Sequence, residues 1–108
     1  MENKPLALAQ IALGATNVIA NLAQLDGWRL FGDGAVLAIE KTFHFPGYLQ
    51  TVAFANAVAF IAECNKHYPE MLVQSQQCSV RWNTRNVQGI SAADFACAAH
   101  VDALLNPN

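Results

Sequence analysis

The residues best suited to acid–base chemistry lie close together near the middle of the chain. Glu63 and His67 are four positions apart, in a segment whose large apolar residues recur every three or four positions. Residues spaced in this way lie on one side of a helix, so the sequence predicts a carboxylate beside an imidazole at the helix end. Histidine titrates near neutral pH, which suits proton transfer. The alternative is structural, with His67 capping the helix and Glu63 holding it at the surface.

The other reactive residue types form no recognisable site. Cys64, Cys78 and Cys97 lie far apart without a Cys-x-x-Cys pair. That arrangement is typical of reduced, buried thiols in a cytosolic protein. The sequence also contains no P-loop, no glycine-rich dinucleotide turn and no nucleophile elbow. We therefore expect no metal ion and no cofactor.

Composition narrows the class of protein. The chain has 108 residues, which suits a single domain over 1–108, and 54% of them are hydrophobic while 13% are charged. A net charge of −2 with six scattered basic residues argues against nucleic acid as a partner. Residues 5–25 carry no charge, but Gln10, Asn17 and Asn21 interrupt their apolar character. Neither a membrane span nor a secretory signal is expected, and the predicted location is cytoplasmic.

The elements that must position these residues can be read from periodicity and turn residues. The predicted order is a helix over 8–25, a hairpin with arms 27–31 and 35–45, a helix over 49–66, strands 71–75 and 78–84, a turn at 86–89, and a last helix. The first helix can break near Gly14, with Thr16 or Asn17 as a new N-cap. The last helix is capped by Ser91, with Asp94 as a capping-box acid. This order predicts an α+β domain, a four-stranded antiparallel sheet with helices packed on one face. Residues 1–15 form an N-terminal extension to it.

Four stretches of the sequence resemble the pterin-4a-carbinolamine dehydratase family. The matching motifs are Gly27-Trp28 with Phe43-His44-Phe45, then Phe54-x-x-x-Val58-Ala59-x-x-Ala62-Glu63-x-x-x-His67-Tyr68-Pro69, then Thr84-Arg85-x-x-x-Gly89-Ile90-Ser91-x-x-Asp94. The resemblance covers roughly residues 22–105 and implies the fold predicted above. It also implies a homo-oligomer, either a dimer or a tetramer, which fits the high apolar content of so short a chain.

The resemblance implies a pocket that has changed its chemistry. In the family a glutamate, two adjacent histidines, a third histidine and an aspartate bind the pterin and dehydrate it. Here Glu63, His67 and Asp94 keep those types and are the implied catalytic residues, whereas Tyr68 and Arg85 replace the other two histidines. A free tyrosine titrates only near pH ~10, and a guanidinium stays protonated. Neither replacement shuttles protons well near neutral pH.

Two functions follow from the resemblance. The first is a non-catalytic assembly factor, or chaperone, for ribulose-bisphosphate carboxylase of the α-carboxysome type, with carboxylase subunits as the protein client and a cytoplasmic, carboxysome-associated location. The second is an active 4a-hydroxytetrahydrobiopterin dehydratase with a variant site, in which His67 is the acid–base group and Asp94 anchors the pterin. A third role, as a transcriptional cofactor, finds no support in this sequence.

Overall fold

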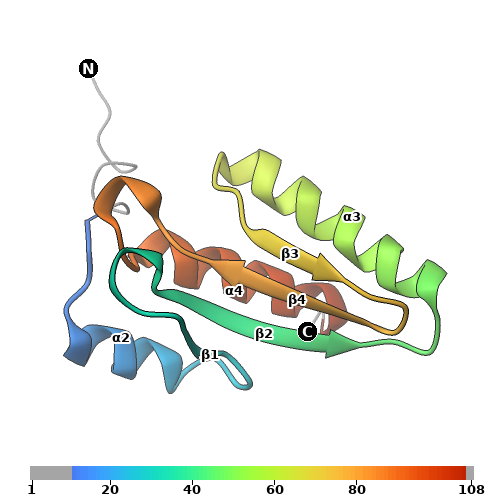
Figure 1. The fold of residues 1–108 in the computed structure, drawn as a ribbon, viewed down its shortest axis with the longest axis horizontal. Helices are drawn as coiled ribbons and strands as arrows, with labels where there is room; N and C mark the ends of the chain where they lie inside the picture. Colours follow the sequence, from blue (N-terminus) through green and yellow to red (C-terminus); the bar gives the residue numbers. More distant parts are fainter. Residues whose placement is uncertain (1–10, 107–108) are drawn as a thin grey trace.

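The computed structural model describes residues 11–106, and these form an antiparallel sheet with helices on one face (Figure 1). The elements run α2 (Ala15–Leu22), β1 (Arg29–Phe31), η1 (Gly34–Val36), β2 (Ala38–His44), α3 (Tyr48–Asn65), β3 (Glu70–Val73), β4 (Gln77–Trp82), η2 (Arg85–Val87) and α4 (Ala92–Leu105). Within the described residues the sheet has four strands in the order β1-β2-β4-β3. This is the predicted α+β fold. No helix within residues 11–106 is long and apolar enough to cross a membrane.

The core lies between the central strands and helices α3 and α4. Strands β2 and β4 pair with Ile39 opposite Trp82 and Phe43 opposite Cys78. Because side chains alternate along a strand, these residues all point to the same face of the sheet. Each of them is at most 5% exposed and belongs to one hydrophobic cluster with Phe54, Val58 and Val101 of the helices. The sheet therefore provides a rigid floor for the segments that follow α3 and β4.

The N-terminal helix is shorter than predicted. Helix α2 begins at Ala15, and its N-cap is Gly14 rather than Thr16 or Asn17. Before it, Ala12 bridges Ser91, and the Leu13 amide donates to the Ile90 carbonyl at 2.8 Å. This extended contact shows that residues 12 and 13 are not helical, and the predicted start at residue 8 lies outside the described residues.

The end of α3 determines where His67 lies. The helix stops at Asn65, and Lys66 adopts the left-handed conformation with φ 52°. The His67 amide donates to the Ala62 carbonyl at 3.1 Å, and the Lys66 amide donates to the Glu63 carbonyl at 3.3 Å. These two bonds form a Schellman motif, in which the chain reverses direction after the helix. His67 is therefore not on the helix, and the predicted i, i+4 alignment with Glu63 is wrong.

The start of α4 agrees with the prediction. Ser91 is the N-cap, and its Oγ accepts a hydrogen bond from the Ala93 amide at 3.3 Å. The Asp94 Oδ2 accepts from the Ser91 amide at 2.9 Å, which completes the capping box.

The prediction of three buried thiols is wrong at one position, because Cys64 is exposed while Cys78 and Cys97 are buried.

Replacing Lys66 tests the turn that directs His67 away from the helix. A left-handed backbone strains every residue except glycine, so Lys66→Gly should be more stable than Lys66→Ala by about 1 kcal/mol. Both variants lose the same exposed ion pair with Glu63, and their difference isolates the backbone. Urea unfolding measures it. Equal stability of the two variants would contradict this account of the turn.

Candidate active site

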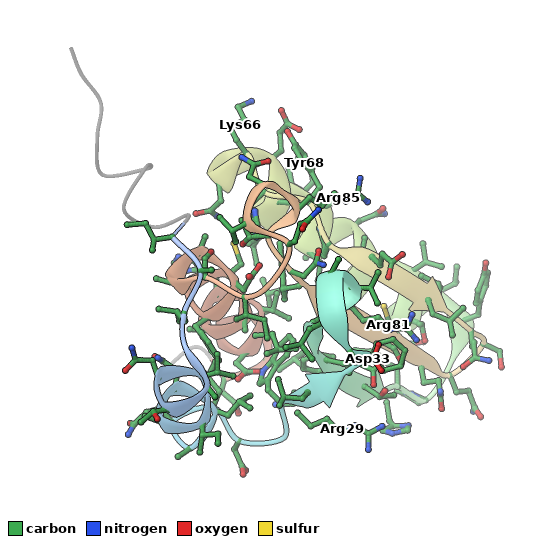
Figure 2. All side chains as sticks on the ribbon, turned by 60° about the vertical axis from the view of Figure 1, so that its left-hand side comes forward. Arg29, Asp33, Lys66, Tyr68, Arg81 and Arg85 are labelled. Atoms are coloured by element: carbon green, nitrogen blue, oxygen red, sulfur yellow. The ribbon has the colours of Figure 1, made fainter. Side chains whose placement is uncertain are left out.

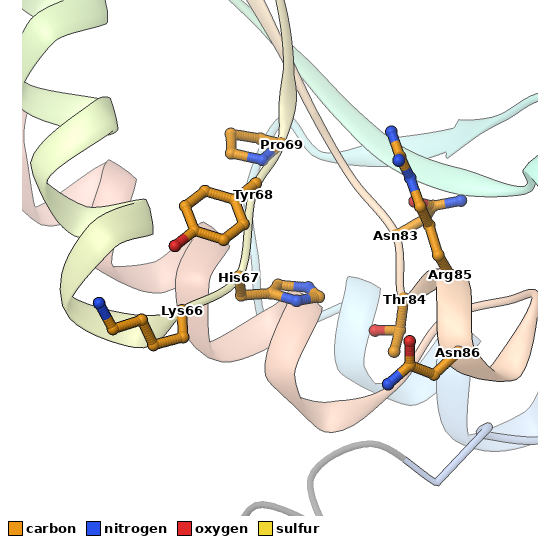
Figure 3. A pocket seen from close by; sticks show the side chains of 8 residues that line it. All are labelled: Lys66, His67, Tyr68, Pro69, Asn83, Thr84, Arg85 and Asn86. Atoms are coloured by element: carbon orange, nitrogen blue, oxygen red, sulfur yellow. The ribbon is translucent and has the colours of Figure 1, made fainter.

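A cavity of about 260 Å³ opens between the segment after α3 and the segment after β4. Its walls are formed by Lys66, His67, Tyr68, Pro69, Asn83, Thr84, Arg85 and Asn86 (Figure 3). One wall comes from the turn created by the Schellman motif, and the other comes from the 3₁₀ turn η2. The two segments lie at the two ends of the β3–β4 hairpin, and the pairing of these strands brings them together.

A fully buried carboxylate lies beneath this cavity. Asp94 is 0% exposed, and its Oδ2 accepts hydrogen bonds from the Thr84 hydroxyl at 2.8 Å and from the Ser91 amide at 2.9 Å. Its Oδ1 lies 2.5 Å from Nε2 of His67. An ionised carboxylate only accepts hydrogen bonds, so with Asp94 ionised the donor of the third contact is Nε2 of His67. The buried charge is thus compensated by three groups from three different segments.

This arrangement fixes the orientation of the His67 ring. The side chain is 11% exposed, and its ring stacks on Trp82 with centroids 5.6 Å apart and planes inclined by 10°. Because the buried carboxylate accepts a hydrogen bond from Nε2, we assign the ring proton to Nε2. Nδ1 is then the nitrogen that can exchange a proton with a ligand. Stacking and hydrogen bonding together hold one tautomer and one ring position, which is the arrangement that general acid–base catalysis requires.

Glu63 does not join this pair. Its side chain is 63% exposed, and it forms an ion pair with Lys66 at 2.8 Å. It also accepts a hydrogen bond from the Tyr68 hydroxyl at 3.3 Å. Glu63 is absent from the residues that line the cavity. Its contribution is to hold the Tyr68 phenol at the cavity rim.

Tyr68 and Arg85 both line the cavity, as predicted for the residues at the positions of the two missing imidazoles. They come from opposite walls (Figure 3), and together with Lys66 they occupy one end of the molecule, away from Arg29, Asp33 and Arg81 (Figure 2). Tyr68 is 59% exposed. The phenol and the guanidinium both offer hydrogen-bond donors to a ligand.

Several contributing residues were not identified from the sequence. Thr84 connects the Asp94 carboxylate to the Ser91 hydroxyl, which lies 2.7 Å from its own hydroxyl. Trp82 is fully buried below His67, and its Nε1 has no hydrogen-bond partner within the described residues. The Ser91-x-x-Asp94 spacing was the available signal, because a capping box places the acid near the preceding loop. Nothing in the sequence indicated that the His67 ring would stack on Trp82.

The remaining titratable groups do not suggest a second reactive site. Within residues 11–106 no group of three histidine, cysteine, aspartate or glutamate side chains is placed to hold a metal ion. Burial, and to a smaller extent the negative charge of Asp94, raise the pKa of Cys97 to about 11. Burial also raises the pKa of Cys78. Both thiols are therefore protonated near neutral pH and are poor nucleophiles.

Comparisons with known proteins give a consistent result. Residues 12–104 match a family described as pterin 4 alpha carbinolamine dehydratase. A protein of Paracidovorax citrulli named "Putative pterin-4-alpha-carbinolamine dehydratase" is 52% identical over 99 residues, which cover 92% of this chain and 85% of that protein. A protein of Xylella fastidiosa strain M23 with the same name is 42% identical over 92 residues, covering 85% and 78% of the two chains.

Two solved structures share the fold. A transcriptional coactivator/pterin dehydratase from Brucella melitensis superposes with a TM-score of 0.80 and 24% identity, covering 87% of this chain and 98% of that one. A pterin dehydratase-like protein identified as a RuBisCO assembly factor in the alpha-carboxysome gives a TM-score of 0.61 and 29% identity, covering 72% and 88%. The first similarity supports the fold alone.

Removing the charge of Asp94 should destabilise the protein. In Asp94→Asn one oxygen becomes a donor that faces other donors, so we expect a loss of about 3 kcal/mol in the free energy of unfolding. Asp33→Asn makes the same chemical change at an exposed position whose side chain caps nothing. It should stay within about 0.5 kcal/mol of the parent. Similar losses in the two variants would contradict the role assigned to Asp94.

Proposed function

The chain belongs to the pterin-4a-carbinolamine dehydratase family, and from that premise we propose that it binds a 4a-hydroxytetrahydropterin in this cavity and dehydrates it with His67 as the only proton carrier. The supporting observation is the bond between Nε2 of His67 and the fully buried Asp94 carboxylate. An imidazole held in this way presents Nδ1 to a ligand and remains oriented through the reaction.

The proposed reaction balances with a single imidazole. Dehydration removes the 4a-hydroxyl and the proton of the neighbouring ring nitrogen, giving water and a carbon–nitrogen double bond. Protonated His67 gives its Nδ1 proton to the departing hydroxyl, which leaves as water. The neutral ring then takes the proton from the ring nitrogen and regains its charge. Asp94 remains ionised opposite the imidazolium and compensates its charge.

The proposed enzyme is slower than a site with a full histidine set. A positioned acid–base group contributes about 10²–10⁴-fold to a rate. Losses of groups that act together do not multiply, so two missing imidazoles cost less than the product of two such factors. Tyr68 and Arg85 then serve binding rather than proton transfer, and Glu63 acts through Tyr68. Asp94 is a positioning residue in this proposal.

A second candidate function is the assembly of ribulose-bisphosphate carboxylase, with carboxylase subunits as the client and association with the α-carboxysome. Two observations support it. Tyr68 and Arg85 stand where proton-shuttling histidines would be expected, and the chain shares its fold with the RuBisCO assembly factor at 29% identity. We place it second because the oriented His67–Asp94 pair suits general acid–base catalysis, whereas the assembly role uses the pair only to compensate the buried Asp94 charge.

We further propose that residues 1–108 form one domain, that the first fifteen are an extension to it, and that the chain self-associates. Leu72 and Val73 of the edge strand β3 are 50% and 37% exposed. An open strand edge with apolar side chains favours pairing with another strand. Sedimentation should therefore give a multiple of the 11.7 kDa monomer mass, and a monomer at micromolar concentration would contradict this.

Substitution of His67 tests the proposed dehydratase. In stopped-flow absorbance the parent should consume a 4a-hydroxytetrahydropterin faster than buffer, and His67→Ala should lose about 10²-fold or fall to the spontaneous rate. His44→Ala is the matched control, because His44 is exposed at the end of β2. Restoring the imidazoles in Tyr68→His/Arg85→His should raise the rate.

Full activity of His67→Ala would refute the proposal. The second candidate makes the opposite prediction. If the chain assembles carboxylase, co-expression should raise the yield of assembled carboxylase equally with the parent and with His67→Ala, and neither should accelerate dehydration.

A further inference from the structure

Arg85, which lines the cavity, has no carboxylate partner within the described residues. Four other cationic side chains within residues 11–106 have a carboxylate partner: Arg29 and Arg81 pair with Glu40, Lys41 pairs with Asp102, and Lys66 pairs with Glu63. Within the same described residues no carboxylate pairs with Arg85. Among the described residues that line the cavity there is no aspartate or glutamate, and the buried Asp94 beneath it bonds His67 and Thr84 rather than Arg85. The guanidinium of Arg85 is therefore available to an anion inside the cavity.

The position of Arg85 specifies where such an anion would bind. Arg85 and Asn83 line the wall opposite Tyr68 and Pro69 (Figure 3). His67, which would carry out the chemistry, extends from the other segment into the space between them. A ring held against His67 would therefore direct a substituent towards a guanidinium and an amide. A guanidinium binds carboxylate or phosphate in a bidentate, planar geometry, and an amide adds one more donor.

We infer that this cavity selects a pterin whose ring substituent ends in an anionic group, a carboxylate or a phosphate, with Arg85 as its counter-ion. This inference rests on the proposed function, because it assumes that the ring is a pterin. A cavity of about 260 Å³ is at the lower limit of ligand pockets, which suits one small ring system and a short substituent. A neutral substituent would leave Arg85 without a partner.

Matched ligands test this inference on the full chain. Isothermal titration should compare 6-hydroxymethylpterin, which has a neutral substituent, with pterin-6-carboxylate, which has nearly the same size and one negative charge. We expect the carboxylate to bind about five- to thirtyfold tighter, and we expect the preference to shrink at high salt because the site is partly exposed. The phosphate ester of 6-hydroxymethylpterin separates the two anions. The tighter of the two identifies the substituent.

Variants test whether Arg85 produces the preference. Arg85→Gln should reduce the carboxylate-to-neutral ratio to about one, and Arg85→Lys should keep part of it because the charge remains. Arg29→Gln is the matched control, since Arg29 is 77% exposed on β1, outside the cavity. Its ratio should equal that of the parent.

The outcomes separate this inference from the proposed function. Equal binding of neutral and anionic pterins to the parent, or an unchanged preference in Arg85→Gln, would overturn the role of Arg85 while leaving the pterin site in place. If none of the three pterins binds at millimolar concentration, the proposed function itself is refuted, and this inference with it.

Discussion

The structure depends on one buried charge. The Asp94 carboxylate has no contact with solvent, and it is tolerated because donors from the end of β4, the start of α4 and the turn after α3 all point at it. The Asp94 Oδ2, which accepts from the Ser91 amide in the capping box of α4, also accepts a hydrogen bond from the Thr84 hydroxyl. A carboxylate with these contacts joins the turn after α3, the segment after β4 and the start of α4, and it fixes the positions of both cavity walls.

Stability and chemistry are therefore coupled in this protein. The bond that holds the His67 ring belongs to the same network as the capping box of the last helix, so His67 cannot reorient without leaving an oxygen of the buried carboxylate without a donor. Trp82 supports the ring from below through stacking. Fixed orientation is what a single acid–base group needs if it must both give and accept a proton. The rigid sheet beneath supplies that precision.

Local rules predicted most of the fold and only part of the site. Gly32-Asp33-Gly34 and Ser91-x-x-Asp94 are strong signals, and the hairpin and the last helix were found where they indicated. The position of His67 relative to Glu63 could not be predicted, because nothing in the sequence marks Lys66 as left-handed; a glycine there would have done so. The exposure of Cys64 was missed because α3 is apolar on its outer face as well, with Leu49 and Phe60 81% and 74% exposed.

The most direct test of the central claim is the protonation state of the three imidazoles, measured by long-range ¹H–¹⁵N NMR of the whole chain. We predict that His67 carries its proton on Nε2 when neutral, with a downfield proton resonance from the short bond to Asp94. His44 and His100 are exposed and should show the mixture of tautomers found in free histidine. A His67 spectrum like those two, or one with the proton on Nδ1, would contradict the account.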